Sequence, residues 1–187
     1  MKLLRIILVT LLVMLVFLFT WSAIGRVGDA LLPGSGENAG ITIEKYSSDT
    51  TAGANIIGMQ PYLTAKNYAN EASFWQVLDQ YMAEAKKQGL LSGKTIVVFP
   101  EYIGSWLVAL EEKYAVYDSS STVTEALTVQ VISNLGKFIP AYFNSNSADR
   151  TKEALFRMKQ DKMCRVYQDV FSRLAKKYAV TIVAGSV

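Results

Sequence analysis

The chain has 187 residues and a formal net charge of +3. This length, with 51% hydrophobic residues, is sufficient for one domain with a packed core and a further segment. It contains no histidine and one cysteine, which excludes a histidine/cysteine metal site and an internal disulfide. Its basic residues form no continuous block, so we expect no nucleic-acid partner.

The N-terminal region is strongly apolar. Residues 6–24, IILVTLLVMLVFLFTWSAI, contain no charge, and as a helix they extend about 28 Å, close to the hydrocarbon thickness of a bilayer. Lys2 and Arg5 come first, which predicts a cytoplasmic N-terminus, and Trp21 fits an interfacial aromatic belt. We expect residues 1–26 to anchor a single-pass membrane protein whose domain faces the periplasm or the cell exterior.

A cleaved signal peptide is the main alternative to a retained anchor. Ala23-Ile24-Gly25 supplies small residues at the spacing of a cleavage site. The apolar run is longer than the usual signal core of roughly 7–15 residues, which favours the anchor. A buried globular helix is disfavoured, because residues 6–19 show no polar face.

A linker is expected to separate this segment from the domain. Residues 27–53 include PGSGENAG and SSDTTAG, which are rich in small and polar residues and show no sustained period. We therefore place the domain at residues 54–187.

The domain is predicted to open with a strand, a helix and a second strand. ANIIGMQPYL, residues 54–63, is a short apolar run closed by proline. Residues 70–90 carry an apolar helical stripe and stop at Gly89, and TIVVF at 95–99 follows. Both strands have the composition of strands buried on both faces. This spacing predicts a βαβ unit, with parallel strands and a right-handed crossover.

The second half of the domain is predicted to contain two helices and a third strand. Residues 122–139 fit a helix, although TVQVI within them alternates like a strand. Residues 152–178 carry a long apolar stripe between lysines and arginines, and VTIVAGSV at 180–187 fits a third buried strand.

Glu101 is the candidate functional residue. It follows the carboxyl end of a predicted parallel strand, where open α/β sheets bind their ligands. Pro100 fixes its own φ and favours an extended Phe99, so the carboxylate stands on a stiff backbone, which suits a catalytic base. A solvated loop glutamate is the alternative, and both interpretations stay open at this point.

The order of three short motifs resembles the N-terminal half of the nitrilase or carbon–nitrogen hydrolase superfamily. The first strand leads to a glutamine, Gln60, and the second to Pro100-Glu101. The long helix leads to a strand that closes on Ala184-Gly185-Ser186. The resemblance covers residues 54–187 and is weakest over 104–149.

The resemblance implies an α/β fold, the nitrilase-like α-β-β-α sandwich, of which this chain would hold the N-terminal half behind one transmembrane helix. It implies hydrolysis of carbon–nitrogen bonds other than peptide bonds, in a small-molecule amide or nitrile, without cofactor or metal, often in a homodimer. The family uses a glutamate, a lysine and a cysteine, and Glu101 takes the glutamate role of general base. Partial burial can raise the pKa of such a carboxylate toward neutrality.

The lysine and the nucleophilic cysteine of the family normally follow the strand matched here by residues 180–187. We therefore expect the chain to be incomplete and inactive alone. Cys164 is no substitute, because its spacing to Tyr167 and Phe171 places it on the apolar stripe of its helix, where a buried structural thiol is expected.

Two other functions remain open. An N-acyltransferase of the apolipoprotein N-acyltransferase type would share the Glu-Lys-Cys site, although those enzymes carry several membrane spans and this chain shows one. A non-catalytic, membrane-anchored binding module would keep the fold without the site.

Overall fold

A computed structural model describes residues 2–32, 40–46 and 53–187. The predicted linker therefore lies partly outside the described residues, at 33–39 and 47–52. The chain divides into two compact units, each treated separately below. The anchor unit consists of residues 1–27 and 111–158, and the sheet unit of residues 28–110 and 159–187.

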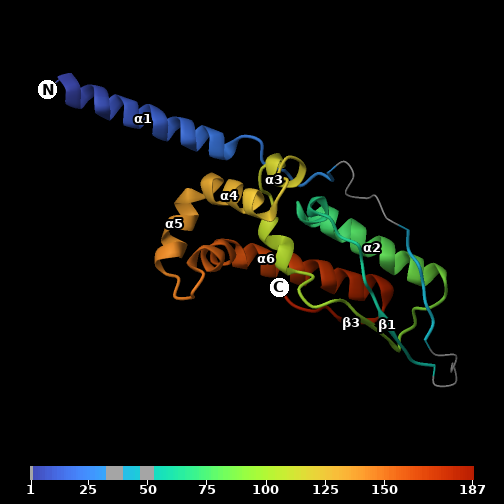
Figure 1. Cartoon of the computed structure of the whole chain (residues 1–187). Helices are drawn as coiled ribbons and strands as arrows, with labels where there is room; N and C mark the ends of the chain where they lie inside the picture. The colour runs from blue at the N-terminus through green and yellow to red at the C-terminus, as the bar shows by residue number, and fades with distance from the viewer. Residues whose placement is uncertain (1, 33–39, 47–52) are drawn as a thin grey trace. The chain divides into compact units, whose positions relative to one another are not determined.

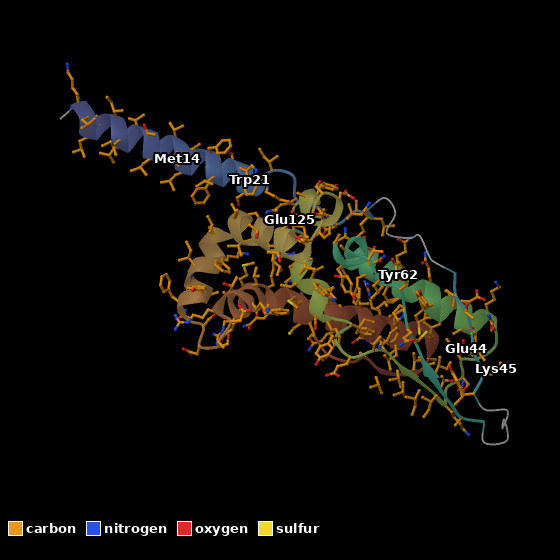
Figure 2. The ribbon with its side chains drawn as sticks, in the orientation of Figure 1. Met14, Trp21, Glu44, Lys45, Tyr62 and Glu125 are labelled. Atoms are coloured by element: carbon orange, nitrogen blue, oxygen red, sulfur yellow. The ribbon has the colours of Figure 1, made fainter. Side chains whose placement is uncertain are left out.

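The first helix, α1, covers Lys2–Ala23 and matches the predicted apolar segment (Figure 1). It is long and apolar enough to cross a membrane, and none of its residues is buried. Figure 2 shows its side chains, Met14 among them, projecting from the helix. A signal sequence near an N-terminus has the same length and composition, so the helix alone does not choose between anchor and signal.

The rest of the anchor unit is helical. It contains α3 (Tyr114–Asp118), α4 (Val123–Ser133), α5 (Leu135–Phe143) and the start of α6 (Arg150–Tyr178). The predicted helical structure of 122–139 is confirmed, but as two helices instead of one, and the strand alternative for TVQVI is wrong. Thr122 caps α4 by accepting a hydrogen bond from the backbone N–H of Glu125, and the helix breaks at Asn134 before α5 begins.

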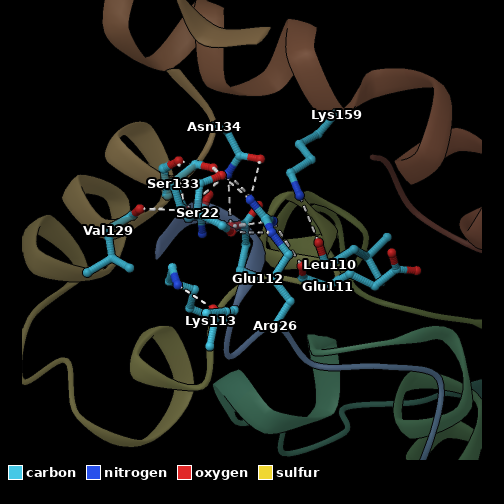
Figure 3. Close-up of polar contacts among 12 residues, drawn as sticks. Ser22, Arg26, Leu110, Glu111, Glu112, Lys113, Val129, Ser133, Asn134 and Lys159 are labelled. Atoms are coloured by element: carbon cyan, nitrogen blue, oxygen red, sulfur yellow. Dashed lines mark hydrogen bonds and ion pairs between the residues drawn. The ribbon is translucent and has the colours of Figure 1, made fainter. Parts of the chain in front are cut away.

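A buried glutamate organises the anchor unit (Figure 3). The side chain of Glu112 is fully buried and accepts hydrogen bonds from Nδ2 of Asn134 at 2.9 and 3.0 Å and from the Ser133 hydroxyl at 3.3 Å. Nη1 of Arg26 lies 3.4 Å from the Glu112 carboxylate. The carboxylate thus has a charged partner and several donors, as a buried charge requires.

The same segment holds the end of α1. The ammonium of Lys113 donates to the backbone carbonyls of Trp21 and Ile24 and lies 4.2 Å from the centre of the Trp21 ring. The Ser22 hydroxyl donates to the carbonyl of Ser133 at 2.8 Å. The last carbonyls of α1 are therefore capped by a cation from a distant part of the sequence, which suits the negative end of a helix.

The sheet unit is built on three parallel strands. They are β1 (Asn55–Gly58), β2 (Thr95–Val98) and β3 (Thr181–Val183), in the order β1-β2-β3. Both neighbouring pairs are parallel, so the predicted βαβ arrangement is confirmed. The strands are shorter than the apolar runs that predicted them.

Two helices make the crossovers between these strands. α2 (Glu71–Lys87) connects β1 to β2, and α6 leads into β3. Asn70 caps α2 through a 2.8 Å hydrogen bond from the backbone N–H of Ser73, and Gly89 follows the helix with φ +71°. The two helices and Phe99, the residue after β2, share an aromatic core, in which the Phe171 ring lies 6.1 Å from that of Phe74 and 5.2 Å from that of Phe99.

The predicted linker begins with residues that pack on α2. Nδ2 of Asn70 donates to the carbonyls of Gly28 and Ala30 at 2.8 and 2.6 Å, and Leu32 is buried. At least these residues are fixed on the sheet unit.

The expectation that the strands are buried on both faces is wrong for the residues described. Ile57 and Val97 face the helices, whereas Ile56 is 73%, Ile96 39% and Val183 50% exposed. The strand order explains this difference. Successive right-handed crossovers that run in one direction across a sheet place both helices on the same face. The other face is apolar and uncovered in the described chain.

The expected burial of Cys164 is also wrong. Cys164 is exposed, because the stripe that α6 buries passes through Met163, Val166 and Val170, and Cys164 lies just outside it.

We therefore predict rapid alkylation of Cys164. An iodoacetamide or maleimide reagent added to the natively folded chain should modify it at nearly the rate found in denaturant, because no packed side chain covers the thiol. Mass spectrometry over time measures the two rates. A native rate far below the denatured rate would contradict the exposed position, and Cys164→Ser serves as the unreactive control.

Candidate functional site

The carboxyl ends of the three strands form the candidate site. The last paired residues are Gly58 of β1, Val98 of β2 and Val183 of β3. The chain continues in parallel beyond them, since the N–H of Met59 donates to the carbonyl of Val98 at 2.8 Å and that of Phe99 to Val183 at 2.9 Å. Two residues past the last pairing stand Gln60, Pro100 and Gly185. The three motifs quoted for the family resemblance therefore end at one edge of one sheet.

Backbone hydrogen bonds fix the loop that carries Glu101. The N–H of Tyr102 donates to the Ser186 hydroxyl at 3.3 Å, and the N–H of Gly104 donates to the Ser186 carbonyl at 3.0 Å. The Tyr167 hydroxyl of α6 donates to the carbonyl of Gly185 at 2.9 Å. The segment after β3 thus lies between the Glu101 loop and the long helix.

Gly185 allows the two loops to approach each other closely. Its φ is +74°, and a Cβ at this position would overlap the carbonyl oxygen of Pro100 and lie 3.3 Å from the Cα of Glu101. A side chain is therefore opposed both by the backbone conformation and by the neighbouring chain. Position 185 therefore requires glycine, because the chain there lies directly against the backbone of Pro100 and Glu101.

Glu101 itself is exposed at the start of a turn. Tyr102 follows with φ +65°, an uncommon conformation for a residue with a side chain, and is 65% exposed. The partial burial expected of a catalytic carboxylate is not provided by the residues that the structure describes. Among those residues the Glu101 carboxylate has no hydrogen bond and no ion pair.

An exposed carboxylate on a fixed loop can accept a proton from a group placed beside it. A carboxylate carries no proton and no positive charge, so it cannot stabilise a developing oxyanion. No cluster of three or more metal-binding side chains occurs within residues 2–32, 40–46 and 53–187.

The sequence had indicated Gln60, Glu101 and the Gly185 motif, but not the residues that fix them. Tyr102 and Tyr167 belong to no sequence motif, because their roles depend on a left-handed backbone turn at Tyr102 and on a contact between Tyr167 of α6 and the end of β3.

A groove of about 640 Å³ lies elsewhere on the sheet unit. It is lined by Trp75 of α2 and by Arg173, whose guanidinium lies 4.4 Å from the centre of the Trp75 ring.

Comparison of this chain with protein-family models, with curated proteins and with solved structures finds no match. The geometry of the strand ends and the motif resemblance are therefore what a functional proposal can rest on.

Proposed function

We propose that the sheet unit is the N-terminal part of a carbon–nitrogen hydrolase of the amidase or nitrilase type, with Glu101 as its general base. One observation supports this most strongly. Gln60, Pro100 and Gly185 stand at the same distance past the last pairing of three neighbouring parallel strands. Motifs far apart in the sequence thus meet at the edge where a parallel sheet presents its ligand site.

The proposed reaction begins with attack of a cysteine thiol on the carbon of a small-molecule amide or nitrile. Glu101 takes the thiol proton and passes it to the substrate nitrogen, which departs from an amide as ammonia or an amine and leaves a thioester. A nitrile instead gives a thioimidate, to which one water adds with release of ammonia to form the same thioester. Glu101 then activates water, which hydrolyses the thioester to the acid and regenerates the thiol. A lysine stabilises the oxyanion. In the family that the chain resembles, the cysteine and the lysine follow the strand matched here by β3, so the proposal assigns only the base to the described residues.

The uncovered face of the sheet supports the sandwich part of the proposal. Ile56, Ile96 and Val183 present apolar side chains on the side opposite α2 and α6. A second sheet packed face to face about 10 Å away would bury them and complete an α-β-β-α sandwich. A homodimer is proposed on the resemblance only.

The test uses the complete protein, including any sequence that follows Val187, with a panel of small amides and nitriles. Ammonia release, and a covalent intermediate of the expected mass on a cysteine, support the hydrolase. Acyl transfer to an amine without hydrolysis favours the acyltransferase instead. Tight binding without turnover of any compound favours the binding module.

We also propose that α1 is retained as a membrane anchor. Trp21, Ser22 and Ile24 are held by Lys113 and Ser133 of the anchor unit. Cleavage at the small residues 23–25 would remove these contacts and expose the groups that make them. Such specific contacts favour a helix that stays attached.

The predicted topology places the domain outside the cytoplasm, because Lys2 and Arg5 lie at the N-terminal end of α1, before its uncharged run. A reporter enzyme that is active only outside the cytoplasm, fused after Val187, should therefore give a signal. A reporter active only in the cytoplasm, fused at the same point, is the matched control and should be silent. The reverse pair of results would show that the orientation is wrong.

A further inference from the structure

A second surface of the anchor unit has the character of a membrane contact. Residues 126–148, which include most of α4 and all of α5, contain one charged side chain, Lys137, and no acidic one. A helix exposed to water on the surface of a domain usually carries charges on its outer face. This segment lacks them.

Its exposed side chains are large and apolar. Phe143 is 76%, Ile139 48% and Ile132 42% exposed. Ile139 and Phe143 are four residues apart in α5 and therefore lie on one face of that helix, and Ile132 lies in the last turn of α4. The Tyr142 ring packs between two phenylalanines, 5.8 Å from Phe138 and 6.1 Å from Phe143. Tyrosine is one of the two residue types that concentrate where a bilayer meets water.

The junction of α4 and α5 is fixed to the end of the proposed membrane helix. Nη2 of Arg26 donates to the carbonyl of Ser133 at 2.7 Å and to Oδ1 of Asn134 at 3.1 Å. The Ser22 hydroxyl donates to the same Ser133 carbonyl. Within α1 only Trp21 and Ser22 are partly covered, so contact is confined to its last turn. Figure 3 shows these contacts between Ser22, Arg26, Ser133 and Asn134. They place the junction beside the end of α1, which is where the proposed membrane helix would leave the bilayer.

We propose that α4 and α5 rest on the lipid surface beside α1, with Ile132, Ile139 and Phe143 inserted among the headgroups and upper acyl chains. The inference rests on the proposed anchoring by α1. A bilayer is the occupant that fits, because the surface is continuous with a membrane-length helix and because residues 126–148, between Glu125 and Asp149, carry no acidic side chain that would oppose anionic headgroups. The sheet unit would then be held by two contacts rather than by one helix.

The experiment uses the full chain in vesicles of phosphatidylcholine with phosphatidylserine. In a Cys164→Ser background, Phe143→Cys and Ile139→Cys are each labelled with an environment-sensitive fluorophore. Ser172→Cys, on an exposed position of α6, is the control. A label inserted about 5–10 Å into the headgroup boundary should emit at shorter wavelength and be quenched by nitroxide lipids on the order of twofold or more strongly than the control. Aqueous iodide should quench the control more strongly.

Three results would overturn the inference. Iodide quenching at Phe143→Cys and Ile139→Cys equal to the control, in chains that stay with the vesicles in alkaline carbonate, shows that α1 anchors the chain while the helices do not dock. Shielding from both iodide and nitroxide lipids shows that protein covers the surface, as in association with a second copy. Release of the whole chain by carbonate would show that α1 does not anchor the chain, and the proposed docking, which rests on that anchor, would fail with it.

Discussion

Replacing Glu101 by glutamine should lower amide or nitrile turnover of the complete protein by on the order of 10²-fold or more, because the amide keeps the size of the side chain and removes its ability to accept a proton. Folding should be nearly unchanged. Glu101 is exposed, and its carboxylate has no ion pair among the residues that the structure describes, so the substitution removes no interaction seen in the fold.

Turnover and thermal unfolding of the variant and the parent should be measured together. Glu44→Gln is the matched control, since it makes the same change at another exposed loop carboxylate and should leave turnover unaltered. Normal turnover by the Glu101 variant would leave Glu101 as a solvated loop residue and would remove the residue on which the hydrolase proposal depends. A loss of activity accompanied by unfolding at lower temperature would point to a structural role instead.

Gly185→Ala should destabilise the sheet unit by about 2–4 kcal/mol, combining the cost of a left-handed backbone for alanine with the cost of overpacking. The added Cβ would overlap the carbonyl oxygen of Pro100, which is backbone and cannot rotate away. Relief requires the segment after β3 to move from the Glu101 loop. We therefore expect the variant to lose turnover in the complete protein as well as stability.

Gly89→Ala separates the two contributions. Gly89 has nearly the same φ, +71° against +74°, but nothing lies within 4 Å of a Cβ placed there. It should cost only the backbone term, about 1–2 kcal/mol. Urea unfolding, followed by circular dichroism on the same detergent-solubilised chain, compares the two variants. Equal destabilisation would mean that the close approach of Gly185 to Pro100 contributes nothing.

The local elements of this protein follow from its sequence because their signals are short-range. Asn70 and Thr122 cap helices that begin immediately after them, and Gly89 ends α2. The uncharged run of α1 depends only on composition, and the parallel pairing of β1 with β2 follows from the helix that connects them. The position of Glu101 past the end of β2 is fixed in the same way.

The sequence could not predict which side chains are exposed to solvent, because that depends on contacts between residues far apart in the chain. An apolar strand is expected to be buried, but its sequence does not show whether one or both of its faces are covered. Two crossovers in the same direction place both helices on one face of the sheet and leave Ile56 and Ile96 exposed on the other. A helical stripe has an edge, and a shift of one residue places Cys164 outside it. Arg26 and Glu112 carry no common motif and meet only because the chain returns to the end of α1. By itself the sequence determined the long helices, the three strands and the order in which they connect, since these depend on neighbouring residues; it did not predict α3 or the break between α4 and α5. Only the tertiary structure decided which faces, charges and loops come together, since those depend on residues brought near by folding.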